Sequence, residues 1–292
     1  MYLALSVLAI ALVLAAVLVI AEGDDKTNTR YVALGDSYSA GMGIKPRDPD
    51  STEACSRSTE SYAFKVQSLY DFDEFDSVTC AGATINDMYT DQPSDSGPIA
   101  EPQLSALNGQ ETMISFSISG NDAGFWSTVM QCLRNPDPRA TPCIDEYVVG
   151  DTDRQRQRID AIRPRLDQLF NDISERSPDA RVYVMGYQRI LPAGAKGCRG
   201  KIDVSAADAD WFDGWQRHLN AMVKASAEAH GAEYLDIYEA SNEHDACKEK
   251  GVRWVEPMIG ASGAHILHPN AAGHEAMTQL FQRALSASRP SS

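Results

Sequence analysis

Four short segments, far apart along the chain, carry residue types that together could transfer an acyl group. Ser37 follows an apolar run at 31–34, and a serine hydroxyl becomes a nucleophile when a base accepts its proton. His268, in a loop near the carboxyl end, is a candidate for that base. The backbone N–H groups of Ser37 and Gly82 and the side-chain amide of Asn121 are candidate donors to an oxyanion.

Short apolar runs bounded by Gly, Asp or Pro predict the β-strands that would position these residues. The runs lie at 31–34, 77–80, 113–119, 181–185 and 233–238. Apolar residues between 159 and 173 fall on one helix face, with Pro164 as a kink or as the true start of that helix. Further helices are predicted at 211–229 and 277–285. Strands separated by helices predict a parallel sheet in a three-layer α/β/α sandwich.

Such a fold would bring the four segments together. Ligands of an open parallel sheet bind beyond the carboxyl ends of its strands. Ser37 follows the first predicted strand, Gly82 the second and Asn121 the third, while His268 precedes the last helix. The glycines around Ser37, at positions 35, 41 and 43, allow the sharp turn that would leave its hydroxyl exposed at the edge of the sheet.

These segments resemble the four motif blocks of the GDSL, or SGNH, hydrolases, in the order and with the spacing of that family. They read Gly35-Asp36-Ser37, Ala81-Gly82-Ala83, Gly120-Asn121-Asp122 and His268-Pro269-Asn270. The resemblance spans residues 31–288 and implies a flavodoxin-like sheet and a lipase or esterase that needs no metal or other cofactor. It implies Ser37 as nucleophile, His268 as base, and an oxyanion hole formed by Ser37, Gly82 and Asn121. We interpret Asp122 as a structural cap.

One position departs from the family pattern. The family usually has Asp three residues before the catalytic histidine, where this sequence has His265, and no carboxylate lies between Glu256 and Glu275. The acid of a triad fixes the imidazole tautomer and stabilises the imidazolium. A backbone carbonyl can do the first and part of the second. The chain also resembles the secreted actinobacterial lipase branch of the family, some members of which use such a Ser–His dyad with a main-chain acceptor. We therefore expect the carbonyl of His265 or Ile266 to accept a hydrogen bond from Nδ1 of His268.

Other polar residues receive structural interpretations. His265 and His268 have a spacing that two metal ligands could have, but no third ligand lies nearby, so we expect no metal site. The acidic run 71–76 lacks the glycine and spacing of a calcium loop, and we interpret it as a solvated face. His244 and His274 are interpreted as surface residues.

Composition and the N-terminus limit the partners and the compartment. The chain of 292 residues has a net charge of -15, which disfavours nucleic acid. Residues 1–21 carry no charge and predict either a cleaved export signal or a retained membrane anchor. Residues 22–30 form a polar linker, and 31–288 one hydrolase domain. We expect a monomer that is secreted or anchored outside the cytoplasm.

The sequence holds six cysteines, none in a CxxC pair. Outside the cytosol such cysteines form disulfides, although the sequence does not fix their pairing. We expect neighbouring cysteines to pair, because this closes three local loops: Cys55–Cys80, Cys132–Cys143 and Cys198–Cys247.

The leading hypothesis is a secreted serine ester hydrolase, a lipase or carboxylesterase and possible triacylglycerol lipase, that acts on small-molecule or lipid esters. An acetyl esterase of carbohydrates would use the same machinery in a narrow polar pocket. An inactive surface binding module is a third hypothesis, which only the missing Asp supports. Phe125, Trp126 and Met130 either line an acyl pocket or belong to a helix core.

Overall fold

A five-stranded sheet runs through the computed structural model, which describes residues 29–287 except 96, 134–136 and 138. Its strands are β1 (Arg30–Ala33), β2 (Glu74–Ser77), β3 (Met113–Phe116), β6 (Arg181–Met185) and β7 (Glu233–Leu235). All neighbours pair in parallel, in the order β2-β1-β3-β6-β7. This is the strand order of flavodoxin-like sheets, so the predicted α/β sandwich is confirmed.

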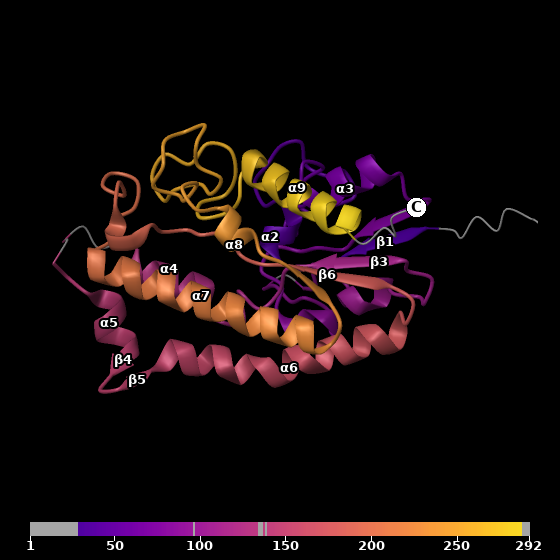
Figure 1. Ribbon diagram of the computed structural model, residues 1–292, viewed down its shortest axis with the longest axis horizontal. Helices are drawn as coiled ribbons and strands as arrows, with labels where there is room; N and C mark the ends of the chain where they lie inside the picture. Colours follow the sequence, from indigo (N-terminus) through magenta and orange to yellow (C-terminus); the bar gives the residue numbers. More distant parts are fainter. Residues whose placement is uncertain (1–28, 96, 134–136, 138, 288–292) are drawn as a thin grey trace, which may run out of the picture.

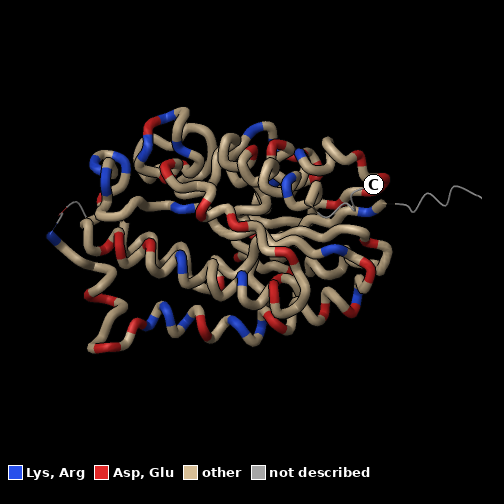
Figure 2. Tube along the Cα trace, in the orientation of Figure 1, with Lys and Arg blue, Asp and Glu red and all other residues tan. Residues whose placement is uncertain are grey.

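Helices cover both faces of the sheet (Figure 1). The four long helices of the two outer layers are α3 (Tyr62–Tyr70), α6 (Arg154–Arg176), α7 (Ala206–Ala229) and α9 (Ala271–Ala287). Successive side chains of a strand point to opposite faces, so Val32 of β1 joins the core under α6 and α7, and Tyr31 joins the core under α3 and α9. Acidic and basic residues lie interspersed along α6 (Figure 2), whose buried residues follow the predicted apolar stripe.

Shorter elements connect these layers. They are α2 (Ser37–Ala40), η1 (Ile85–Met88), η2 (Gln103–Ala106), α4 (Phe125–Cys132), α5 (Pro142–Tyr147), β4 (Val148–Val149), β5 (Thr152–Asp153), η3 (Ala193–Ala195) and α8 (Ile237–Ala240). Most of them follow the carboxyl end of a strand, where the site residues are expected.

Pro164 lies inside α6 and does not mark its start. The helix begins at Arg154 because the carboxylate of Asp153 caps it, accepting hydrogen bonds from the backbone N–H groups of Gln155 and Arg156. The interpretation of Pro164 as the start of the helix is therefore wrong.

The acidic run 71–76 contains most of β2, which begins before the predicted strand at 77–80. Arg30 of β1 forms ion pairs with Glu74 at 2.9 Å and with Asp76 at 2.6 Å. These pairs link the two neighbouring strands, so the run is part of the sheet and not merely a solvated face.

Three disulfides join Cys55 to Cys80, Cys132 to Cys143 and Cys198 to Cys247. They are the neighbouring pairs expected from the sequence. The second bridge connects the last residue of α4 to α5, and α4 carries two residues of the pocket described below.

The predicted signal or anchor at 1–21, and the linker up to residue 28, lie outside the described residues. Within the part of the chain that the structure describes, no helix combines the length and the apolar character needed to cross a bilayer.

Candidate active site

Ser37 begins α2, directly beyond the carboxyl end of β1. The turn before it requires Gly35, whose φ is 122° and where a Cβ would lie 2.5 Å from the carbonyl oxygen of Ser117. The carboxylate of Asp36 then caps α2, accepting a hydrogen bond of 2.9 Å from the backbone N–H of Tyr38. This local structure holds Ser37 at the edge of the sheet, 8 % exposed.

His268 reaches Ser37 from the other end of the chain. Its Nε2 lies 2.8 Å from Ser37 Oγ, and its Nδ1 lies 2.8 Å from the carbonyl oxygen of Ile266. Because a carbonyl oxygen only accepts hydrogen bonds, Nδ1 carries the proton and Nε2 is free to take the proton of the serine. Burial lowers the pKa of His268 to about 4, although the Ile266 carbonyl acts in the opposite direction. The imidazole is therefore neutral near pH 7, as a general base must be.

His265 occupies the position where the family usually has Asp. Its ring lies edge-on to that of His268, with centroids 5.1 Å apart, and its Nδ1 is 3.3 Å from the same Ile266 oxygen. The carbonyls of His265 and Ile266 were both expected as acceptors for Nδ1 of His268. In the structure, the Ile266 carbonyl lies at hydrogen-bonding distance from that nitrogen. This geometry is that of a Ser–His dyad with a main-chain acceptor.

A short antiparallel bridge fixes the loop that carries His268. Glu256 N–H donates to the His268 carbonyl at 3.0 Å, and Leu267 N–H donates to the Glu256 carbonyl at 2.9 Å. The buried Glu256 carboxylate accepts from Arg253 at 2.7 Å and from Asn270 at 3.1 Å. Burial alone would raise the pKa of Glu256, but these hydrogen bonds hold it below its ordinary value. The backbone of His268 is thus held in place by both segments of the bridge.

The candidate oxyanion donors lie in one open pocket of about 390 Å³, which Ser37, Gly82, Asn121 and His268 all line. Asn121 Nδ2 donates one hydrogen to the carbonyl of Ala83 at 2.9 Å, which leaves its second amide hydrogen for a ligand. Within the described part of the chain, no group accepts a hydrogen bond from the backbone N–H of Ser37 or Gly82. All three donors are therefore available to a substrate oxygen.

Asp122 connects the two loops that supply these donors. Its carboxylate accepts from the backbone N–H of Ile85 at 3.0 Å and from Arg165 at 2.7 Å. Arg158 of α6 also donates to its carbonyl oxygen at 2.7 Å. Asp122 therefore holds the loop after β3 against η1, a structural role that extends beyond capping.

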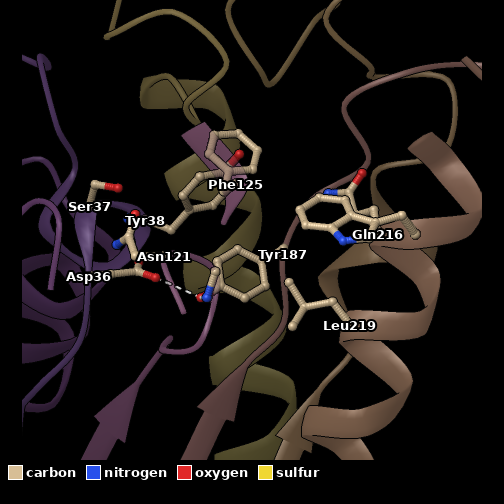
Figure 3. Close-up of a pocket in the computed structure, with 10 residues that line it drawn as sticks. Asp36, Ser37, Tyr38, Asn121, Phe125, Tyr187, Gln216 and Leu219 are labelled. Atoms are coloured by element: carbon tan, nitrogen blue, oxygen red, sulfur yellow. Dashed lines mark hydrogen bonds between the residues drawn. The ribbon is translucent and has the colours of Figure 1, made fainter. Parts of the chain in front are cut away.

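The walls of the pocket are largely apolar. Phe125 and Trp126 both line the open pocket, and Trp126 is 46 % exposed. Phe125 also lines a narrow crevice of about 20 Å³ (Figure 3), which shares Ser37 and Asn121 with the open pocket. Met130 lines neither space. The other apolar residues of the open pocket are Met42, Ala54 and Ala81.

His274 is fully buried, so its interpretation as a surface residue is wrong. Its Nδ1 accepts a hydrogen bond of 3.1 Å from the backbone N–H of Tyr62 in α3, and its ring stacks on that of Tyr62. Burial lowers the pKa of His274 to about 3. His244 is half-buried and stacks on Trp254, with ring centroids 3.9 Å apart. Neither histidine lines the open pocket.

Comparisons with known proteins agree with the fold described above and with the resemblance of the motif segments. The profile of the GDSL-like Lipase/Acylhydrolase family matches residues 33–276. Lipase 2 of Streptomyces coelicolor is 35 % identical over 254 residues, which cover 85 % of this chain and 83 % of that protein. Two crystal structures each cover 88 % of this chain and 99 % of their own, with TM-scores of 0.72: phospholipase A1 from Streptomyces albidoflavus, 26 % identical, and the extracellular lipase from Streptomyces rimosus, 27 % identical. This chain belongs to the GDSL-like lipase/acylhydrolase family.

Proposed function

We propose that this protein is a serine carboxylic ester hydrolase that works through an acyl-enzyme on Ser37. The observation that carries the proposal is the 2.8 Å contact between Ser37 Oγ and the unprotonated Nε2 of His268. Gly82 and Asn121 line the same pocket, so nucleophile, base and oxyanion donors share one space. Relatives named lipase and esterase agree with this activity.

In the proposed mechanism, Ser37 Oγ attacks the ester carbonyl carbon while His268 Nε2 takes its proton. The oxygen of the tetrahedral intermediate accepts hydrogen bonds from the N–H groups of Ser37 and Gly82 and from the Asn121 amide. The carbonyl of Ile266 stabilises the imidazolium through Nδ1–H. His268 then gives its proton to the leaving alcohol, which leaves the acyl group on Ser37. Water attacks this ester by the same steps in reverse and releases the acid.

The pocket walls favour an acyl chain over an acetylated sugar. Met42, Phe125 and Trp126 offer apolar surface, and each CH₂ group buried against such a surface contributes about 0.8 kcal/mol. A sugar would leave hydroxyl groups without partners against these side chains, and unpaired polar groups are costly. We therefore place the acetyl esterase second. The inactive module comes third, because the 2.8 Å contact between Ser37 Oγ and His268 Nε2 supports an active pair.

Hydrolysis of p-nitrophenyl octanoate and p-nitrophenyl acetate by the purified protein tests the function, with Ser37→Ala as the blank. Ser68→Ala, an exposed serine on α3, is the matched control and should keep full activity. A preference for octanoate supports an acyl-chain hydrolase. A preference for acetate moves the proposal to the acetyl esterase. Activity no greater than that of Ser37→Ala on either ester would favour the binding module.

We also propose that the protein is exported and acts as a monomer. Three disulfides need an oxidising compartment, and the relative from Streptomyces rimosus is described as extracellular. N-terminal sequencing of the protein from the culture medium of an exporting host tests this. A start near residue 22 supports a cleaved signal, whereas intact protein in the membrane fraction supports an anchor at 1–21. Light scattering of the purified protein gives its oligomeric state.

A further inference from the structure

Tyr187 belongs to none of the four motif segments, yet its hydroxyl connects two of them. The hydroxyl donates to Asp36 Oδ2 at 2.6 Å (Figure 3) and accepts a hydrogen bond of 2.8 Å from the backbone N–H of Gly120. Asp36 immediately precedes the nucleophile Ser37, and Gly120 immediately precedes Asn121. One phenol oxygen therefore joins the segment of the nucleophile to the segment of an oxyanion donor.

This connection is buried and closely packed. Tyr187 is 5 % exposed and Asp36 1 % exposed. A Cβ added at Gly120 would lie 3.0 Å from Oη and from Cζ of Tyr187, so the phenol fills the space of a side chain. The amide of Asn220 on α7 holds the backbone of Tyr187 on both sides, accepting from its N–H at 2.8 Å and donating to its carbonyl at 2.9 Å. The ring has little freedom to leave this position.

The segment that Tyr187 contacts needs such support. Ser119, next to Gly120, has a φ of 96°, a conformation that residues other than glycine rarely adopt. A strained backbone persists only when its surroundings hold it. Without the phenol oxygen, the Gly120 N–H and Asp36 Oδ2 would both lose their partner in a buried place. Movement of either segment to find a new partner would displace Asn121 relative to Ser37.

We propose that Tyr187 is a positioning residue for the oxyanion hole. Through its hydrogen bond with Gly120, Tyr187 fixes the position of Asn121 relative to Ser37. This role rests on the proposed ester hydrolase function. Tyr187 touches no reacting atom in the proposed mechanism, because its hydroxyl donates its one hydrogen to Asp36 and accepts from the Gly120 N–H. Its removal should weaken binding of the transition state and leave binding of the ester itself nearly unchanged.

The first test is Tyr187→Phe, assayed with p-nitrophenyl octanoate. Loss of a whole oxyanion donor lowers kcat by about 10²–10³, so displacement of one donor should lower kcat about 10- to 100-fold, with KM within about twofold. The inhibition constant of an alkyl boronic acid, whose adduct with the serine carries the tetrahedral anion, should rise by the same factor as kcat/KM falls. The matched control is Tyr31→Phe, which removes a buried hydroxyl bonded to Ser115 Oγ at 2.6 Å and should leave kcat unchanged.

A double-mutant cycle separates positioning from a general loss of stability. If Tyr187 acts through Asn121, then Tyr187→Phe should cost less than about threefold in kcat in an Asn121→Ala background. A full 10- to 100-fold further loss in that background would overturn the proposal, because Tyr187 would then act elsewhere. Wild-type kcat in Tyr187→Phe would also overturn it.

A second variant serves if Tyr187→Phe folds poorly. Gly120→Ala presses a methyl group against the phenol while it keeps both hydrogen-bonding partners, and it should reproduce the loss of kcat at unchanged KM. Wild-type kcat in Gly120→Ala would refute the role. A wild-type protein no more active than Ser37→Ala would instead refute the proposed function, and the role with it, before any variant of Tyr187 is compared.

Discussion

His268 Nδ1 lies 2.8 Å from the carbonyl oxygen of Ile266, which belongs to the same loop. A carbonyl fixes the tautomer as the carboxylate of a triad does, but it carries only a partial negative charge and stabilises the imidazolium less. Burial therefore dominates, and the pKa of His268 is lowered to about 4. As the proposed base, His268 is weaker than the histidine of a triad but stays unprotonated at lower pH.

The first prediction concerns the pH dependence of activity. Because His268 must be neutral to act, kcat/KM for p-nitrophenyl octanoate should fall with an inflection near pH 4 on the acid side, and not near the ordinary histidine value of 6.5. Initial rates between pH 3.5 and 8 measure this, with return of each sample to pH 7 to show that the loss is reversible. A reversible inflection between pH 6 and 7 would contradict the assigned environment of His268.

The second prediction separates the two neighbouring histidines. His268→Ala should lower kcat about 10⁴-fold or more, because it removes the base. His265→Ala should change kcat less than about threefold, since the Ile266 carbonyl already holds Nδ1 of His268. Steady-state kinetics of both variants measure this. Collapse of activity in His265→Ala would show that the main-chain acceptor is not sufficient.

Restoring the family's acid gives the third prediction. His265→Asp places a carboxylate beside His268, and a nearby negative charge raises the pKa of an imidazole. The acid inflection of kcat/KM should therefore move upward by about one pH unit or more. His265→Asn has nearly the same shape without the charge, so its inflection should stay close to that of the wild type. Equal profiles for the Asp and Asn variants would count against this electrostatic account.

The fourth prediction concerns the pocket wall. Trp126→Ala removes a large apolar side chain from the open pocket, so KM for p-nitrophenyl octanoate should rise about 3- to 10-fold. KM for the acetate ester should stay within about twofold, because its acyl group is too short to use that wall. Leu69→Ala, an exposed apolar residue on α3, is the control and should change neither value. Equal effects on both esters would place Trp126 outside the acyl path.

The fifth prediction concerns stability. His274 stays neutral in the fold, with a pKa lowered to about 3 by burial, but titrates near 6.5 once unfolded. The unfolded state therefore binds more protons below pH 6.5, and the stability that His274 contributes is lost as the pH falls towards 3. His268 contributes in the same direction. Asp36, whose pKa burial raises to about 7, contributes in the opposite direction.

A comparison with His274→Asn isolates this contribution, because the Asn oxygen can still accept from the Tyr62 N–H. The stability advantage of the wild type over His274→Asn should shrink by about 2–3 kcal/mol between pH 7 and pH 4.5. Urea unfolding at both pH values measures it. Ser68→Ala, which removes no titratable group, serves as the control, and its effect on the free energy of unfolding should be the same at both pH values. A constant difference for His274→Asn would mean that His274 is not kept neutral by burial.

Much of this site could be predicted because its residues follow strand ends. Apolar runs locate the strands, and a parallel sheet brings their carboxyl ends to one edge, so Ser37 and Asn121 were expected to meet. The sequence left His265 and Ile266 as equal candidates for the carbonyl acceptor, since the direction of a carbonyl depends on loop backbone angles. Tyr187 carries no local signal, because its partners come from the loops after β1 and β3.

Two of the wrong expectations have a common physical cause, which is pairing between residues distant in the sequence. β2 begins within the acidic run because Arg30 on the neighbouring strand pairs with Glu74 and Asp76. His274 is buried because the backbone of Tyr62 on α3 supplies a donor to its ring. In each case a polar residue joins a strand or the core because it pairs with a residue far away in the sequence. The residues next to it in the sequence do not indicate that partner.

Ser37 and His268 are 231 residues apart in the sequence, so their contact exists only where the fold brings β1 and the loop before α9 together. A nascent or truncated chain that lacks the loop of His268 would have the proposed nucleophile without its proposed base. On the proposed mechanism, turnover therefore requires that both segments are in place. Recovery of activity during refolding should therefore not precede the formation of the contact between Ser37 and His268.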